Sequence, residues 1–222
     1  MATVLLVHGN GAEGSTSFPD STGNCTVTAT GNAKVTRTNS NFPAGALSLD
    51  GTGGSHLAVT NLPTRPADLT EQFWVYLNSV GSGTFFDYRA TGGPLLYVAS
   101  SNLKFLGGYI TGDGTGVSVA TLVAAQKTHI AVERYGDIFN IYVNGSSVFR
   151  GTGSGGGPDP GDWGESFLIG ESKDGGNVLN GLMADYSIDN TALYKDSNFT
   201  PPPVYTGGTV LVRRRPLFLM AS

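Results

Sequence analysis

The chain has 222 residues, a length that a single β-rich domain commonly reaches. Glycine accounts for 33 residues and charged residues for only 14% of the chain, a composition that favours turns and strands over helices. The net charge of −4 at pH 7 argues against a nucleic-acid-binding protein, because such proteins concentrate lysine and arginine on one face.

The chain begins with an apolar run, Thr3–His8, followed by Gly9, Gly11 and Gly14 in the spacing G-x-G-x-x-G. A dinucleotide-binding fingerprint needs a helix after the third glycine, because the helix N-terminus supplies the amides that hold the pyrophosphate. Here Pro19 and a Gly-Asn turn follow instead. We therefore expect Thr3–His8 to be a strand and the glycines to give the next loop its backbone freedom.

Runs of alternating or β-branched residues, separated by Gly, Asn, Asp and Pro, continue along the whole chain. They are Thr3–His8, Thr26–Thr30, Ala33–Arg37, Ala46–Asp50, His56–Thr60, Glu71–Leu77, Thr84–Arg89, Leu95–Ala99, Asn102–Leu106, Val117–Val123, Thr128–Tyr135, Ile138–Asn144, Ser147–Arg150, Ser166–Gly170 and Gly181–Ile188. Only Val119–Ala125 also fits a helix. This pattern predicts an all-β, two-sheet antiparallel jelly-roll sandwich with little helix.

The run Glu71–Leu77 contains adjacent aromatic residues. Alternation along a strand places Phe73 and the aliphatic residues on one face, and Trp74 and Tyr76 on the other. The first face is expected in the core. The second face either stacks on sugar rings or lies under a second sheet or a covering loop.

Residues with catalytic chemistry are sparse. The three histidines, His8, His56 and His129, have no metal-ligating spacing and are interpreted as strand or strand-end residues. Asp185 and Asp189 are four residues apart and so share one face of a strand, as the paired acids of a glycosidase would, but a solvated sheet face explains them at least as well. We therefore predict that the chain is not an enzyme.

No cofactor is predicted. Cys25 is the only cysteine, which excludes an intrachain disulfide and a zinc site of several cysteines. Calcium is conceivable at Asp113, Asp159, Asp162 or Asp174, but none of these lies in a loop with the dense acidic spacing of a calcium site.

Two segments, Gly107–Gly116 and Gly151–Trp163, are loops by composition. They are either plain surface loops or loops that approach a ligand closely, since glycine removes the Cβ atom. Tyr109 and Trp163 are the candidate glycan-binding residues in them.

The C-terminal residues 203–222 are predicted to form an extended arm, leaving residues 1–202 as the jelly-roll domain. Three prolines from Pro201 stop the last element, and an extended run and apolar residues follow. The candidate partner-binding residues are Val210, Val212, Arg213, Arg214, Arg215, Leu217, Phe218 and Leu219. The arm is expected to pack by strand addition, on its own domain or on a neighbouring subunit.

From Val4 to Pro202, pieces of the chain resemble, in order, the concanavalin A-like, laminin-G-type jelly-roll family common among phage virion proteins. The pieces are VLLVHGNGAEGSTSFPDSTGN, TVTATGNAKVT, AGALSLDGTGGSHLAV, EQFWVYLNSV, THIAVERYGDIFNIYVNGSSV and FLIGESKDGGNVLNGLMADYSIDNTALYKDSNFTPP. The sequence KTHIA keeps His129 of the family's WHHIA pattern but lacks its tryptophan. The resemblance implies two antiparallel sheets and a non-catalytic part of a tail, fibre or capsid surface.

These observations lead to two alternative functions. The first is a non-enzymatic phage virion subunit, capsid-decorating or tail-associated, docked through its termini on other virion proteins and expected to be a homo-oligomer. The second is a carbohydrate-binding, host-attachment module that uses cell-surface glycans. The apolar run Val4–Val7 is too short for a signal peptide or a membrane span, so we expect synthesis in the host cytoplasm, location in the virion and no membrane partner.

Overall fold

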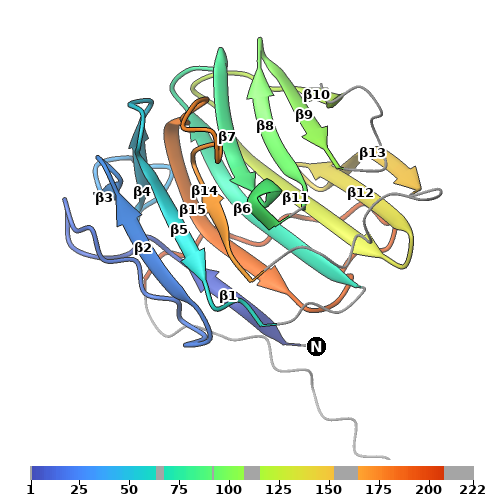
Figure 1. Ribbon diagram of the computed structural model, residues 1–222, viewed down its shortest axis with the longest axis horizontal. Helices are drawn as coiled ribbons and strands as arrows, with labels where there is room; N and C mark the ends of the chain where they lie inside the picture. The colour runs from blue at the N-terminus through green and yellow to red at the C-terminus, as the bar shows by residue number, and fades with distance from the viewer. Residues whose placement is uncertain (1, 64–67, 92, 108–115, 153–164, 208–222) are drawn as a thin grey trace, which may run out of the picture.

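The computed structural model describes residues 2–63, 68–91, 93–107, 116–152 and 165–207. Two antiparallel sheets stack face to face as a sandwich (Figure 1). Within these ranges the helical content is one turn of 3-10 helix, η1 (Arg89–Thr91), and no helix is long and apolar enough to cross a membrane. The all-β, two-sheet antiparallel prediction is confirmed.

The first sheet has eight strands. The order is β13-β12-β11-β6-β15-β4-β3, and β1 also pairs with β15. The strands are β1 (Thr3–Val7), β3 (Lys34–Thr36), β4 (Ala46–Asp50), β6 (Leu69–Leu77), β11 (Lys127–Tyr135), β12 (Ile138–Val143), β13 (Ser146–Thr152) and β15 (Asn180–Asp189). β6 pairs along one edge of β15, and on the other edge β4 pairs with its first half and β1 with its second half, so β15 is paired along both of its edges.

The second sheet has seven strands in the order β10-β9-β8-β7-β14-β5-β2. They are β2 (Thr26–Thr30), β5 (His56–Thr60), β7 (Ser82–Asp87), β8 (Leu95–Ala99), β9 (Asn102–Leu106), β10 (Val117–Thr121) and β14 (Phe167–Ile169). Each strand overlaps a run that the sequence predicts, although β7 begins two residues before its run, Thr84–Arg89. Val119–Ala125, which also fitted a helix, contributes to β10 and the turn after it.

The core lies between the two sheets. Phe73 and the aliphatic residues of β6 point into it, whereas Trp74 and Tyr76 lie on the outer face, as alternation predicts. A charged residue, Glu71, is also fully buried, and it accepts hydrogen bonds from the phenols of Tyr88, beyond the end of β7, and of Tyr186, on β15. Glu71 thus links the two sheets from within the core.

A β-bulge changes the direction of side chains halfway along β15. Ala184 pairs with Trp74 and Ser187 with Gln72, so two residues of β15 oppose the single residue between those partners on β6. Asp185, in the bulge, has a φ of 53°. After the extra residue Tyr186 points into the core, and Ser187 lies on the outer face beside Gln72.

The glycine-rich loop after β1 consists of turns and irregular backbone, and no helix follows its third glycine, as the sequence predicts. Gly9 has a φ of 70°, and a Cβ atom there would lie 2.8 Å from the backbone carbon of Ala46. Asp20 accepts hydrogen bonds from the amides of Leu6, Thr22 and Cys25. Burial raises the pKa of Asp20, but the bond from the Thr22 hydroxyl and the amide bonds outweigh it and lower that pKa overall.

After β15 the chain turns back over the outer face of the eight-stranded sheet. We call residues 191–207 the covering segment. The amides of Tyr194 and Lys195 donate to the carboxylate of Glu133, at 2.6 and 2.7 Å. Further along, the ring of Phe199 stacks on that of Tyr194 at 3.5 Å between centroids, and its amide donates to the Gly145 carbonyl. Residues 203–207 of the predicted arm belong to this segment; 208–222 lie outside the described residues.

Candidate functional site

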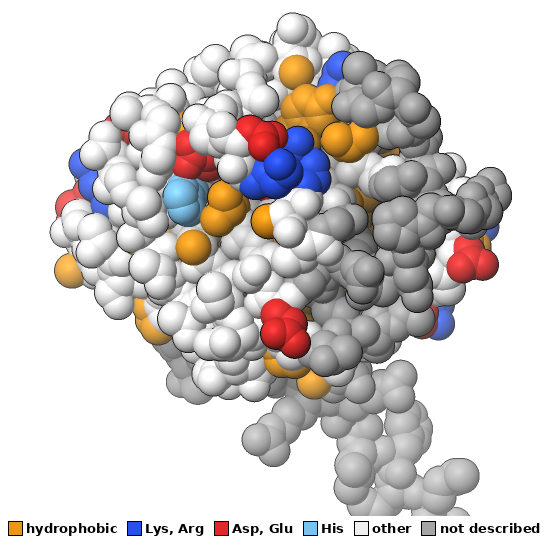
Figure 2. Space-filling view, in the orientation of Figure 1, with side chains coloured by type: hydrophobic (Ala, Val, Ile, Leu, Met, Phe, Trp, Pro, Cys, Tyr) orange, Lys and Arg blue, Asp and Glu red, His pale blue; other side chains and the backbone are white. Residues whose placement is uncertain are grey.

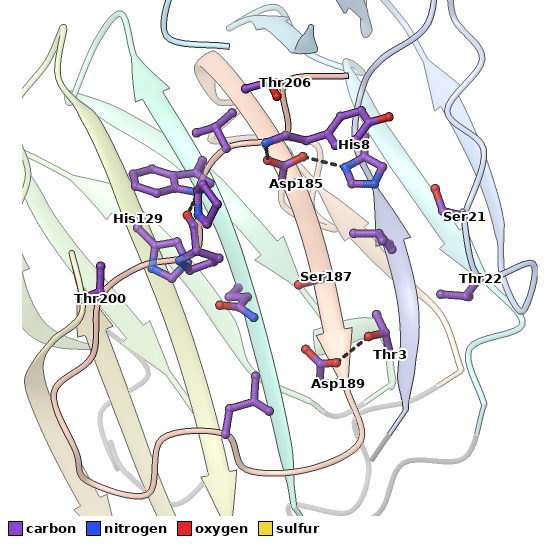
Figure 3. A pocket seen from close by; sticks show the side chains of 18 of the residues that line it. Thr3, His8, Ser21, Thr22, His129, Asp185, Ser187, Asp189, Thr200 and Thr206 are labelled. Carbon is purple, nitrogen blue, oxygen red and sulfur yellow. Dashed lines mark hydrogen bonds and ion pairs between the residues drawn. The ribbon is translucent and has the colours of Figure 1, made fainter. Parts of the chain in front are cut away.

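A pocket of about 560 Å³ lies between the outer face of the eight-stranded sheet and the covering segment. Its floor comes from β1, β15, β6 and β11, and the turn at Ser21 and Thr22 closes one side (Figure 3). This volume is within the range of small-molecule binding sites.

A histidine and an aspartate form a pair beside the end of the covering segment. His8, directly after β1, lies with Nδ1 2.7 Å from Oδ1 of Asp185 in the β15 bulge. The other carboxylate oxygen of Asp185 accepts the amide of Tyr205 at 2.7 Å, and the Tyr205 ring stacks on His8 at 4.2 Å. His8 is only 8% exposed, and among the described residues nothing hydrogen-bonds to its Nε2.

A second histidine, His129 of β11, also lines the pocket. It is 1% exposed, and neither ring nitrogen has a hydrogen-bond partner within the described ranges. Burial lowers its pKa from 6.5 to about 4, so the ring is neutral at pH 7. The two histidines thus bring ring nitrogens that have no hydrogen-bond partner among the described residues to a largely buried site.

Trp74 lies next to His129, with ring centroids 5.0 Å apart. Its Nε1 donates to the carbonyl of Pro202 at 3.2 Å, and the ammonium group of Lys127 lies 5.1 Å from the ring centroid. The outer face of β6 lies under a covering loop, which is one of the alternatives that the sequence left open. Trp74 remains half-buried and still lines the pocket, so an aromatic surface is available to a ligand.

The predicted sharing of one strand face by Asp185 and Asp189 is confirmed, because both line the pocket. The interpretation of a solvated sheet face is wrong: Asp189 is 8% exposed, and its Oδ1 accepts a hydrogen bond from the Thr3 hydroxyl at 2.7 Å. The covering segment and β1 shield these carboxylates from water. Ser187 and Gln72 add polar groups beside them.

The third histidine is not part of the pocket. His56 lies on β5 in the other sheet, with Nδ1 2.6 Å from Oε2 of the buried Glu171. Arg89 of η1 forms ion pairs with Asp87 and Asp174. Acidic and basic side chains lie side by side on the face shown in Figure 2. Among the described residues no group of three or more His, Cys, Asp or Glu could hold a metal ion.

Most of the residues chosen as sites from the sequence fall outside the described ranges. These are Tyr109 and Trp163, the arm residues Val210, Val212, Arg213, Arg214, Arg215, Leu217, Phe218 and Leu219, and the calcium candidates Asp113, Asp159 and Asp162. The sequence missed the pairing of His8 with Asp185 and the contribution of Tyr205. Their separations of 177 and 20 residues give no local pattern, and only the shared face of Asp185 and Asp189 pointed to the site.

The pocket combines features suited to sugars. Trp74 and Tyr205 give it aromatic rings, Thr3, Thr22 and Ser187 give it hydroxyl groups, and its lining contains no lysine or arginine among the described residues. Sugar-binding sites use aromatic surfaces for the apolar face of a ring and polar groups for its hydroxyls.

Residues 50–197 match a family model described as the concanavalin A-like lectin/glucanases superfamily. Comparison with curated protein sequences gives no match. Among solved structures, domain 4 of an extracellular arabinanase from Geobacillus stearothermophilus, in complex with arabinotriose, is 18% identical, with a TM-score of 0.63 over 86% of this chain and 94% of that one.

Two toxin structures are also similar. The receptor-binding domain of botulinum neurotoxin D is 13% identical, with a TM-score of 0.65 over 88% of this chain and 50% of that one. The binding domain of Paraclostridial Mosquitocidal Protein 1 is 14% identical, with a TM-score of 0.64 over 87% and 50%. The chain therefore spans about half the length of these toxin domains, and at such identities the likeness shows the fold alone.

Proposed function

The chain belongs to the concanavalin A-like lectin/glucanases superfamily, and from this premise we propose that it is a non-catalytic binding module that holds a glycan in the pocket under the covering segment. One observation carries the proposal. Nε2 of His8 is buried, has no hydrogen-bond partner among the described residues, and belongs to a side chain that lines the pocket. Buried polar atoms are normally hydrogen-bonded, so this atom is suited to a ligand.

The structural neighbours support the same class of function. The arabinanase domain was solved with arabinotriose, and cell entry of botulinum neurotoxin type C, which provides a further structural neighbour, depends on interaction with two ganglioside molecules. One fold can serve many functions, so the pocket of this chain, more than its fold, supports glycan binding.

The first prediction tests the pocket. His8→Gln removes the ring that faces Asp185, and we expect it to weaken glycan binding by about ten-fold, equivalent to about 1.4 kcal/mol. The measurement is titration calorimetry of the full chain with a glycan selected on an array. His56→Gln is the matched control, because His56 also pairs with a carboxylate but lies on the other sheet. Equal affinities of the two variants would contradict a site at His8.

The glycine-rich loops provide the competing location. Tyr109→Ala and Trp163→Ala remove the aromatic residues that the sequence suggested for glycan binding. Under the present proposal both variants keep the affinity of the parent chain within about two-fold. A large loss in either one, with His8→Gln unaffected, would move the site to those loops.

We also propose that the module is a phage virion subunit made in the host cytoplasm, docked through its termini as a homo-oligomer. Support comes from the resemblance of the residues that form β1, its loop and the first part of the covering segment to phage virion proteins. Deleting residues 208–222, which keeps the covering segment, should abolish incorporation into particles and leave a folded domain. Particles that still contain the shortened chain would contradict docking by the arm.

A further inference from the structure

We infer that the pocket selects neutral or amino sugars and rejects acidic glycans, with a sugar hydroxyl or amine donating a hydrogen bond to Nε2 of His8. This inference rests on the proposed function, since it names the class of glycan that the same pocket takes. Three features of the site carry it: the protonation pattern of His8, the charges of the lining and the neutral His129.

The protonation pattern of His8 follows from its partner. Asp185 can only accept hydrogen bonds when it is ionised, so Nδ1 of His8, at 2.7 Å, must carry the proton. In a neutral imidazole the other nitrogen is then an acceptor. In this neutral form of His8, Nε2 needs a donor from a ligand. Sugar hydroxyls and amines are donors, whereas a carboxylate is an acceptor only and would face Nε2 with no proton between them.

The charges of the lining act in the same direction. Asp185 and Asp189 are both mostly buried, and no lysine or arginine belongs to the described lining. Both oxygens of Asp185 already accept bonds, from His8 and from the Tyr205 amide, so its charge stays fixed in the pocket. A carboxylate brought beside these two would be desolvated with no partner of opposite charge, which is strongly unfavourable in a partly buried site.

His129 does not provide the missing positive charge. Its burial keeps the ring neutral at pH 7, and its nearest aromatic neighbours are Trp74 and Phe199. A neutral imidazole offers one donor and one acceptor, which is the pattern that a sugar hydroxyl matches. Lys127, on the same strand, lies over the Trp74 ring and is not part of the described lining.

The experiment compares matched glycans on the full chain at pH 7.5. An array carries each neutral glycan beside its sialylated and its uronic-acid counterpart, with arabinotriose and an amino-sugar oligomer included. Calorimetry then measures the tightest neutral ligand and its acidic counterpart. We expect the acidic member of the pair to bind at least ten-fold more weakly. Equal binding of the two, or a preference for the acidic one, would overturn this inference and leave the proposed function standing.

Two single variants separate the effect of the His8 protonation pattern from the effect of negative charge in the pocket. Asp185→Asn removes one charge, and its amide NH₂ can donate to Nδ1 of His8, which turns Nε2 into a donor. We expect this variant to lose at least ten-fold in affinity for the neutral ligand and most of its discrimination against acids. Asp189→Asn removes one charge without touching His8, so it should lose less affinity for the neutral ligand than Asp185→Asn and reduce the discrimination against acids by a smaller factor.

Controls keep the outcomes distinct. Glu171→Gln makes the same change at His56 on the other sheet, and it should alter neither affinity nor discrimination. Thermal unfolding of each variant checks that it is folded. If Asp185→Asn behaves like Glu171→Gln, the role of His8 is wrong even where acids are rejected. If no glycan of either class binds the parent chain, the proposed function fails and this inference with it.

Discussion

At the scale of single residues, the two pocket histidines differ in what holds them. His8 has a carboxylate at 2.7 Å, whereas the ring of His129 packs against the aromatic rings of Trp74 and Phe199. This difference cannot be predicted from the sequence, where each histidine stands alone. The environment gives His129 a measurable effect on stability, because its pKa differs between the folded and unfolded chain.

We predict that His129 makes the protein less stable as the pH falls from 6.5 to 4. The folded state holds its pKa at about 4, whereas the unfolded chain binds a proton near pH 6.5. Stability is therefore full above pH 6.5 and decreases through this window, by up to roughly 3 kcal/mol. Denaturant unfolding at pH 7 and pH 4.5 measures the decrease.

His129→Phe is the informative variant, since the His129 ring makes no hydrogen bond within the part of the chain that the structure describes. Its unfolding free energy should depend much less on pH over this window, and His56→Gln serves as the control histidine. Carboxyls whose pKa is lowered by folding, such as that of Asp20, change the free energy of unfolding mainly below their ordinary pKa of 3.8. That range lies outside the window from pH 6.5 to 4. An unchanged decrease in His129→Phe would contradict the prediction.

At the scale of elements, the covering segment depends on a close approach of two backbones. Gly145, in the turn between β12 and β13, has a φ of 80°, and a Cβ atom there would overlap the carbonyl oxygen of Phe199. No side chain larger than hydrogen fits without displacing the segment. The position of Phe199 in turn fixes Pro202, whose carbonyl accepts the Trp74 indole.

Gly145→Ala should therefore detach the covering segment from the sheet. We expect red-shifted Trp74 fluorescence, measured in a Trp163→Phe background, together with weaker glycan binding. Gly136→Ala is the matched control, because Gly136 has a φ of 53° but nothing within 4 Å of an added Cβ atom. Both variants have the backbone strain of a positive φ, but only the Cβ atom of Gly145→Ala meets the Phe199 carbonyl. Only Gly145→Ala should therefore change fluorescence and binding.

The strands could be predicted from the sequence because each is a local pattern. Alternation in β6 placed Phe73 in the core and Trp74 outside it, and both assignments are confirmed. The covering segment could not be predicted, since its contacts with Glu133, Gly145 and Trp74 join residues that are distant in the chain. The bulge at Asp185 also leaves no signal, because the extra residue is defined only by its partner strand.

At the scale of the whole molecule, the core is continuous from one sheet to the other. Phe73 of the eight-stranded sheet stacks with Phe85 of the seven-stranded sheet, and Glu71 accepts hydrogen bonds from tyrosines on either side. Neither sheet buries its inner face without the other. We therefore expect one cooperative unfolding transition.

Tyr88→Phe tests this link. It removes a hydrogen bond to a buried carboxylate and should lower the free energy of unfolding by about 1.5–3 kcal/mol. Tyrosine circular dichroism and tryptophan fluorescence should report the same midpoint in denaturant, before and after the change. Tyr76→Phe, on the outer face, is the control and should cost less. Two separate midpoints would mean that the sheets unfold independently.

The bulge in β15 has a consequence for comparing this chain with its relatives. The extra residue acts as a phase shift: before it, one alternation decides which side chains face inward, and after it, the opposite one does. An ungapped alignment with a relative that lacks the bulge would match Asp185 or Ser187 to core positions. Pocket residues of two such proteins can be compared only after a one-residue gap is placed at position 185.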